Sequence, residues 1–373
     1  MKFTTLIASL TLVAVQPLFG GAALAQEVVK IGVAQVFEGP SGYYGDAALK
    51  GMQVALDMLN ERDAFKGKKI VFVTEETQGK PPVATAAVRK LAQQADILAI
   101  VGPTRSIEAI AAAPIANQAM IPMIAQASGG KWPQPPGPWV FKLAMPAYEN
   151  GPVLQAVAER TKAKTMSVMY DLDDEAALSA LEDVKVQAQR LNIRIVATEA
   201  HRGTDIDMSG QISRIRAANP DIFYYASKAE TGGLIIRTAR ERGIKAPIVA
   251  WGAPGGIEKT AKEATEGVIS QSALDAASPD PLMRDFVARY AKRFGAGAKI
   301  DHYHGYGFDA MLLLADAMGR AGAKPTRQSL RDAIASTKNL RGVTGTLSWS
   351  GSEVSRSSAA VVVMQGGNWV SYK

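Results

Sequence analysis

The segment DILAIVGPTRSIEAIAAAPIANQAMIPMIAQASGG, residues 96–130, decides the fold that the sequence predicts. Its first apolar run, 97–101, has the length and composition of a buried parallel strand. A Gly-Pro turn ends this strand, and Thr104 or Ser106 is placed to cap the Ala-rich helix that follows. A second short strand then leads into the small-residue loop 125–130. The segment therefore predicts two parallel strands whose carboxyl ends lie side by side.

The carboxyl edge of such a sheet is where open α/β proteins bind their ligands. A helix N-terminus flanked by hydroxyl groups also favours a carboxylate, because the free N–H groups there carry partial positive charge. The simpler interpretation is that the glycine turn only connects two elements and that Ser128 caps a turn. The segment alone leaves both interpretations open.

The first 25 residues have the pattern of a secretory signal peptide. Lys2 supplies the positive start, 6–15 the apolar core, and Ala23-Leu24-Ala25 an A-x-A cleavage site. This core is too short to span a membrane, and no later segment reaches about eighteen uninterrupted apolar residues. No Cys follows the cleavage site, which argues against a lipid anchor. We therefore expect a mature chain that begins near Gln26 and is soluble in the periplasm.

The composition narrows the class of protein further. The chain contains no cysteine and has a net charge of +7, which falls to +6 when a signal peptide with one Lys and no acidic residue is removed. Without disulfides, stability must come from apolar burial, and about 350 residues suffice for two cores. The basic residues are scattered and form no stripe interleaved with aromatic residues, which argues against a nucleic-acid partner.

Strands and helices alternate in two successive sets along the chain. The set between 28 and 143 reads β-α-β-α-β-α-β, the set between 147 and 270 repeats the alternation, and helices and strands of a different order follow. This order predicts an α/β protein of two lobes, because the chain returns after both sets are complete. The expected parts are the signal peptide 1–25, a first lobe of 26–146 plus 272–348, and a second lobe of 147–271 plus 349–373, with crossings near 145–148, 270–275 and 347–350.

Four segments stand out in their order and spacing. They are GPSGYYGDAALKGMQVALDMLN at 39–60, IVGPTRSIEAIAAAPIANQAMIPMI at 100–124, DIFYYASKAETGGLIIRTARERGI at 221–244 and YGFDAMLLLADAM at 306–318. Together, behind a signal peptide, they resemble the type I periplasmic solute-binding proteins, and within these the leucine/isoleucine/valine-binding family that serves ABC importers. The resemblance covers essentially the whole mature chain. It implies two Rossmann-like lobes, joined by a three-crossing hinge, that close on a small molecule.

The resemblance also implies a set of ligand-binding positions, with the ligand carboxylate at the first lobe. The positions of this sequence that match them are Tyr44, Ser106, Ala127, Ser128, Gly129 and Tyr303. Neutral donors that converge at helix ends suit a single carboxylate. The resemblance further implies a monomer that delivers its ligand to the membrane permease subunits of an ABC importer.

The sequence departs from the family where an amino-acid ammonium is commonly held. The matching loop is 250–256, and the position of the family's acidic residue is Pro254, which has no acceptor side chain. A neighbouring position that is often aromatic is Lys228, for which ligand contact and solvation are equally open. Possible substitutes for the missing acceptor are Asp171, Asp173, Glu175 and Glu230. We therefore expect a small carboxylate with an apolar or aromatic body, with aliphatic amino acids close behind.

Two further residues carry open alternatives. Arg105 precedes Ser106 and is a candidate ligand contact, but it also lies three residues before Glu108 and could form a helix pair. Trp251 is a candidate ligand contact in the loop after a late strand of the second set, and a packing role is equally open.

An enzyme is the main alternative class. His302 and His304 are spaced like a metal pair, but no third ligand has suitable spacing, and His201 is the only other histidine. The sequence contains no Cys nucleophile, no G-x-S-x-G and no Walker pattern. We therefore expect no catalytic residue, metal or cofactor. A receptor that feeds a membrane sensor stays open as an alternative, with a hydrolytic enzyme on the same fold as the weaker one.

Overall fold

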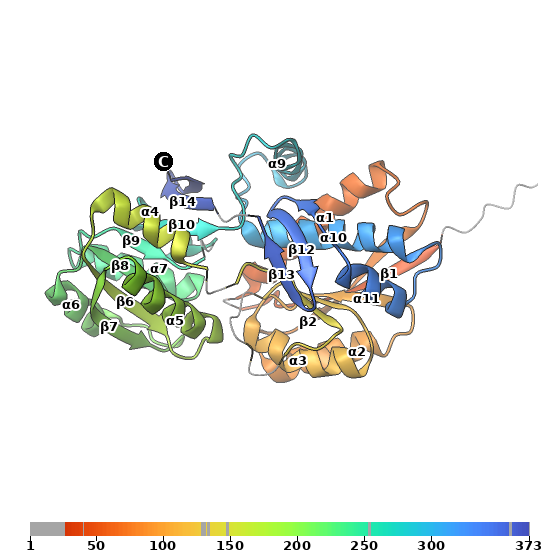
Figure 1. Cartoon of the computed structure of the whole chain (residues 1–373), viewed down its shortest axis with the longest axis horizontal. Helices are drawn as coiled ribbons and strands as arrows, with labels where there is room; N and C mark the ends of the chain where they lie inside the picture. The colour runs from red at the N-terminus through yellow and green to blue at the C-terminus, as the bar shows by residue number, and fades with distance from the viewer. Residues whose placement is uncertain are drawn as a thin grey trace, which may run out of the picture.

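The protein consists of two α/β lobes that lie side by side (Figure 1). The structure is a computed structural model and describes residues 27–39, 41–127, 132, 135–146, 149–252, 255–357 and 360–372. We call the part built on the five-stranded sheet the first lobe and the part built on the seven-stranded sheet the second lobe. The α/β class predicted from the alternation of strands and helices is confirmed.

The first lobe contains a sheet in the order β2-β1-β3-β4-β5, and all four strand pairs are parallel. Its strands are β1 (Val28–Gln35), β2 (Lys69–Glu76), β3 (Ile97–Val101), β4 (Met123–Ala125) and β5 (Val140–Lys142). Helix α1 (Gly42–Glu61) covers one face, while α2 (Pro81–Ala92) and α3 (Ser106–Gln118) cover the other. The short apolar strands are buried on both faces, which is the expected pattern for a parallel sheet.

The second lobe repeats this order. Its sheet reads β7-β6-β8-β9-β10 in parallel and adds two antiparallel strands, β14 and β15, beside β10. The strands are β6 (Thr165–Asp171), β7 (Arg194–His201), β8 (Ile222–Ala226), β9 (Ile248–Ala250), β10 (Ile269–Ser272), β14 (Ala360–Gln365) and β15 (Asn368–Ser371). The helices α4 (Gly151–Thr161) and α5 (Glu175–Arg190) pack on one face, and α6 (Ser209–Ala218), α7 (Ala229–Glu241) and α8 (Ile257–Ala261) on the other.

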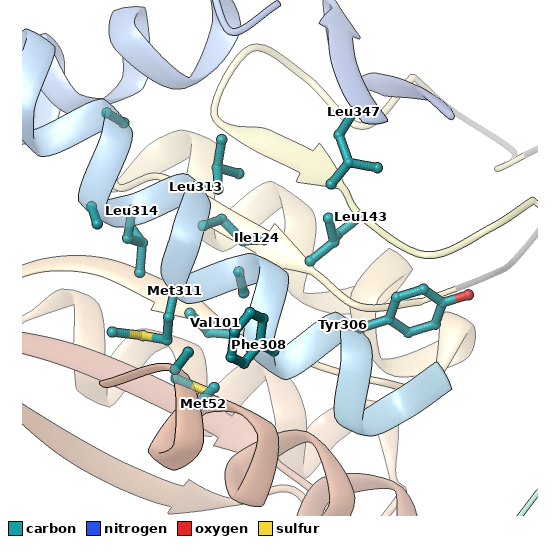
Figure 2. Close-up of a cluster of buried hydrophobic side chains, with 14 of the residues drawn as sticks. Met52, Val101, Ile124, Leu143, Tyr306, Phe308, Met311, Leu313, Leu314 and Leu347 are labelled. Carbon is teal, nitrogen blue, oxygen red and sulfur yellow. The ribbon is translucent and has the colours of Figure 1, made fainter. Parts of the chain in front are cut away.

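After β10 the chain returns to the first lobe. It forms the helices α9 (Pro281–Phe294), α10 (His302–Ala321) and α11 (Arg327–Ala335), and then a small antiparallel sheet of β11 (Leu340–Gly342), β12 (Gly345–Ser350) and β13 (Glu353–Arg356). Figure 2 shows Phe308, Met311 and Leu314 of α10 beside Met52 of α1 and Val101 of β3 in one buried cluster. The returning helix therefore completes the core of the first lobe.

The third change of lobe comes later in the chain than the sequence predicts. The crossing expected at 347–350 falls within β12, which stays paired to β13 through Ser350. β13 in turn contacts β5 of the first sheet, whereas β14 pairs with β10 of the second. The pairing of β12 with β13 keeps this hairpin with the first lobe. The chain therefore changes lobe between Arg356 and Ala360, and the other predicted lobe boundaries stay predictions.

The helices α1 and α10 approach each other at the level of their backbones. A Cβ atom added at Gly51 would lie 1.9 Å from the carbonyl oxygen of His304, and one added at Gly307 would lie 1.9 Å from that of Ala48. Only glycine fits at these two positions, since real Cβ atoms do not come within 3.0 Å of such atoms.

Within the described residues, no helix combines the length and the apolar composition that a membrane span requires.

Candidate functional site

A pocket lies between the two lobes at the carboxyl ends of both sheets. In each sheet the chain order reverses at one point, between β1 and β3 in the first lobe and between β6 and β8 in the second. Crevices at such points are where α/β sheets bind ligands. Here the loops after β3, β6 and β8, together with Tyr44 in the first turn of the helix after β1, contribute to one pocket. The pocket is lined by Tyr44, Thr104, Arg105, Ser106, Ile107, Met145, Pro146, Asp174, Ala176, Ser227, Lys228, Trp251, Gly252, His302, Tyr303 and Tyr306.

The first turn of α3 forms the wall of the pocket on the first lobe. The expected cap by Thr104 or Ser106 is wrong: Arg105 occupies the N-cap position, and no side chain caps the helix. The Thr104 hydroxyl is buried without a hydrogen-bond partner among the described residues. Because both hydroxyl residues line the pocket instead of closing the helix, they and the open helix end offer donors to a carboxylate.

Arg105 forms no ion pair with Glu108 in the described part of the chain, so the structure does not support the helix-pair interpretation. Its Nη1 donates a long hydrogen bond of 3.4 Å to the carbonyl oxygen of Gly79, and the residue is only half-buried. Glu108 is fully buried, and burial raises the pKa of its carboxyl group. The Arg105 guanidinium therefore stands at the pocket as a positive group.

Aromatic side chains form the centre of the pocket. The rings of Tyr44 and Tyr303 lie 4.8 Å apart, and the Tyr44 hydroxyl accepts a hydrogen bond of 3.1 Å from the backbone N–H of Ala229. Burial raises the pKa of both phenols, so they stay neutral. The Tyr306 hydroxyl accepts from the N–H of Met145 at 3.0 Å. This part of the pocket therefore suits an apolar or aromatic ligand body.

His302 is the polar member of this aromatic group. It is 5% exposed, and its Nδ1 has no hydrogen-bond partner among the described residues. Burial, opposed by Asp301, lowers the pKa of His302 to about 4, so the imidazole is neutral at neutral pH. The neighbouring His304 points elsewhere, because its Nδ1 lies 2.9 Å from Asp301 Oδ1.

The wall on the second lobe carries charges of both signs. Lys228 Nζ lies 3.4 Å from Asp171 Oδ2 and 4.0 Å from Asp174 Oδ2. Asp171 is fully buried behind the wall, whereas Asp174 and Ser227 line the pocket. The Ser227 hydroxyl is buried and has no hydrogen-bond partner in the part of the chain that the structure describes.

The structure brings together most of the residues predicted from the sequence. The predicted residues that line the pocket are Tyr44, Arg105, Ser106, Lys228, Trp251 and Tyr303. Asp171 lies one layer behind, where it contacts Lys228. Ala127 is fully buried in the apolar cluster with α2 and α3 and does not line the pocket. Ser128, Gly129 and Pro254 lie outside the described residues, so their predicted roles stay predictions.

Several pocket residues were missed by the sequence reasoning. Asp174 was not among the possible substitutes for the missing acceptor, and His302 was considered only as a possible metal ligand. The signal for Asp174 was available, since an Asp directly before an amphipathic run is a typical N-cap at a strand-to-helix turn. Ser227 and Tyr306 gave no comparable signal, because their roles depend on which loops the two sheets bring together. No group of three or more potential metal ligands occurs among the described residues.

Comparison with known proteins extends the description of this site. A family model described as "Periplasmic binding protein" matches residues 28–368. "Leu/Ile/Val-binding protein homolog 7" of Brucella suis is 24% identical over 308 residues, which cover 77% of this chain and 76% of the relative.

Two solved structures show the same fold. The branched-chain amino acid transporter substrate-binding protein LivJ of Streptococcus pneumoniae, in complex with isoleucine, has a TM-score of 0.84 at 22% identity and covers 92% of this chain and 98% of its own. A solute-binding protein of an ABC transporter from R. palustris, in complex with 4-hydroxybenzoate, has a TM-score of 0.80 at 17% identity and covers 93% and 96%. The same architecture therefore holds an amino acid in one protein and an aromatic acid in another.

Proposed function

The chain belongs to the periplasmic binding protein family, in its leucine/isoleucine/valine-binding branch, and from this premise we propose that it captures a small carboxylate between its lobes for an ABC importer. The family and the solved neighbours are substrate-binding proteins and not enzymes. The observation that carries the proposal is that the ligand-binding edges of both sheets open into one pocket.

The proposed binding mode follows from the two kinds of wall. The open first turn of α3, with Ser106 and Arg105, takes the carboxylate, because both the helix end and the guanidinium favour negative charge. The rings of Tyr44 and Tyr303 contact the apolar or aromatic body of the ligand. Closure of the lobes around a hinge then buries the ligand, and the closed form is what permease subunits recognise.

Export precedes this function in the proposal. Residues 1–25 direct the chain to the periplasm as a cleaved signal peptide, and the mature protein begins at Gln26. N-terminal sequencing of the secreted protein tests this, and a chain that retains residues 1–25 would contradict it.

The binding proposal predicts that carboxylates stabilise the mature protein. A ligand at one hundred times its dissociation constant stabilises the folded state by about 2.7 kcal/mol, which raises the melting temperature by a few degrees. We expect this shift with at least one of leucine, valine, phenylalanine, benzoate-type acids and short dicarboxylates in a thermal-shift panel. Ser106→Ala should weaken binding of that ligand about tenfold, because a hydrogen bond to a charged group is lost.

The matched control is Ser209→Ala, at the first position of α6 and away from the pocket. It should leave the dissociation constant unchanged. A panel in which no carboxylate shifts the protein, or in which Ser106→Ala binds like the wild type, would argue against the proposed binding mode.

A further inference from the structure

Asp174 lines the pocket, and only one of its two carboxylate oxygens is used by the helix cap. It is the N-cap of α5, and its Oδ1 accepts hydrogen bonds from the N–H groups of Ala176 at 2.9 Å and Ala177 at 3.3 Å. These two bonds fix the orientation of the carboxylate. Oδ2 takes no part in the cap, and the residue lines the pocket. The 4.0 Å between Oδ2 and Lys228 Nζ is too long for a hydrogen bond.

Asp174 shares its cationic partner, Lys228, with Asp171. Asp171 and Asp174 contribute two negative charges and Lys228 one positive charge, which leaves a net charge of −1. Lys228 lies closer to Asp171, whose Oδ1 is held by the N–H of Asp173 at 3.0 Å. Glu230 lines a neighbouring pocket that shares Arg105 and Lys228 with this one. It does not offset the negative charge, and burial raises the pKa of its carboxyl group.

An independent feature of the same wall points to a ligand. Ser227 is 2% exposed and lines the pocket, and its hydroxyl has no hydrogen-bond partner among the described residues. A buried polar group without a partner is unfavourable unless something else supplies the partner. The first-lobe wall is positive through Arg105 and the open end of α3, so the two walls of the pocket differ in polarity.

We infer that Asp174 is a specificity-determining residue of this pocket: its Oδ2 accepts a hydrogen bond from an N–H or O–H donor on the part of the ligand that faces the second lobe. This inference rests on the proposed function and refines its ligand class. The preferred ligand carries its carboxylate toward α3 and a donor group, an ammonium or a hydroxyl, toward Asp174. The buried Ser227 hydroxyl supplies a second contact to the same donor group.

The test compares ligand pairs that differ only in the donor. Isothermal titration of the mature protein is carried out with leucine against 4-methylpentanoate and with 4-hydroxybenzoate against benzoate. The wild type should bind the donor-bearing member of at least one pair about tenfold more tightly, because a hydrogen bond to a charged acceptor is formed. The first pair reports an ammonium and the second a hydroxyl.

Asp174→Asn should remove this preference. Asn is as good an N-cap as Asp, so α5 keeps its cap, while an amide that can present N–H groups replaces the charged acceptor. Binding of the donor-bearing ligand should fall about tenfold or more, whereas that of its donor-free partner should change less than about twofold. Asp174→Ser, which also caps well, should behave in the same way. The matched control is Asp280→Asn, because Asp280 caps α9 through the N–H groups of Leu282 and Met283 and does not line the pocket.

Three outcomes would overturn the inference. One is that Asp174→Asn keeps the full preference, and another is that it weakens both members of a pair equally. The third is a wild type that binds carboxylates but favours the donor-free members. These results leave the proposed carboxylate binding intact, whereas a wild type that binds no carboxylate at all would contradict the proposed function and this inference together.

Discussion

His302 makes the stability of this protein depend on pH. Burial lowers its pKa to about 4 in the folded state, against about 6.5 in an unfolded chain. Besides its aromatic neighbours, the charged or titratable groups that act on it are Asp301, His304 and Arg356. Between about pH 6.5 and pH 4, His302 binds a proton in the unfolded state but stays neutral in the folded state. The full stability is therefore present above pH 6.5 and is lost as the pH falls toward 4.

We therefore expect His302→Gln to lose less stability than the wild type between pH 7 and pH 4. The difference should approach about 3 kcal/mol at the acid end of this window, since each pKa unit corresponds to about 1.4 kcal/mol. Urea denaturation at a series of pH values measures it. Parallel stability curves for the two proteins would show that His302 does not carry this dependence.

At the scale of single residues, the sequence predicted the types of contact better than their partners. Tyr44, Ser106 and Tyr303 were placed at the pocket by position in the family, and all three line it. For Lys228 the sequence left ligand contact and solvation equally open, but the structure shows that its ammonium group also lies 3.4 Å from the buried Asp171. Such a pair joins a strand end to a turn more than fifty positions away, and spacing along the chain gives no signal for it.

The crossing of α1 and α10 tests the packing of elements. Gly307→Ala would place a methyl group 1.9 Å from the carbonyl oxygen of Ala48, so the helices must separate. We expect a loss of at least about 1–3 kcal/mol in the free energy of unfolding, measured by urea denaturation. The matched control is Gly319→Ala on the same helix, where nothing lies within 4 Å of the added methyl. This variant should be unchanged or more stable by about 0.5–1 kcal/mol, because Ala is the better helix former.

If Gly307→Ala is as stable as Gly319→Ala, the close approach of the two helices does not constrain the fold. At the scale of whole elements, the sequence predicted some strands and helices and missed others. The alternation of strands and helices over 28–143 and 147–270 was predicted, since the apolar periodicity of the longer elements is strong. The short strands β11 and β13 were not predicted, because they have three and four residues and are defined by pairing rather than by pattern.

Among the described residues, two hydrogen bonds join the lobes across the cleft. The Tyr44 hydroxyl accepts from Ala229 N–H at 3.1 Å, and Asp301 Oδ2 accepts from Gly255 N–H at 3.0 Å. We expect the mature protein to become more compact when a carboxylate binds, because a ligand that contacts both lobes favours the closed arrangement in which these two hydrogen bonds are formed. Small-angle scattering with and without saturating ligand measures the change. An unchanged radius of gyration at saturation would contradict closure.

Tyr44→Phe should weaken closure, because the Ala229 N–H loses its acceptor. An unpaired buried N–H costs about 1–3 kcal/mol, so ligand affinity should fall about fivefold or more. Tyr290→Phe serves as the control, since Tyr290 packs against Phe286 within the first lobe. Equal affinity for Tyr44→Phe and Tyr290→Phe would show that the cross-lobe hydrogen bond does not contribute to ligand capture.

The helix α10 and the last strands come late in the chain, and their position affects when the two lobes can fold during synthesis. The core of the first lobe includes Leu347, Trp349 and Val354, and the cores of the second lobe include Val363 and Met364. The first lobe therefore cannot complete its core before Val354 has left the ribosome, and the second lobe cannot do so before Met364, although domains with continuous chains fold from the N-terminus onward during synthesis. This delay favours the proposed export, because a chain whose topology postpones folding stays unfolded for longer while it is being made.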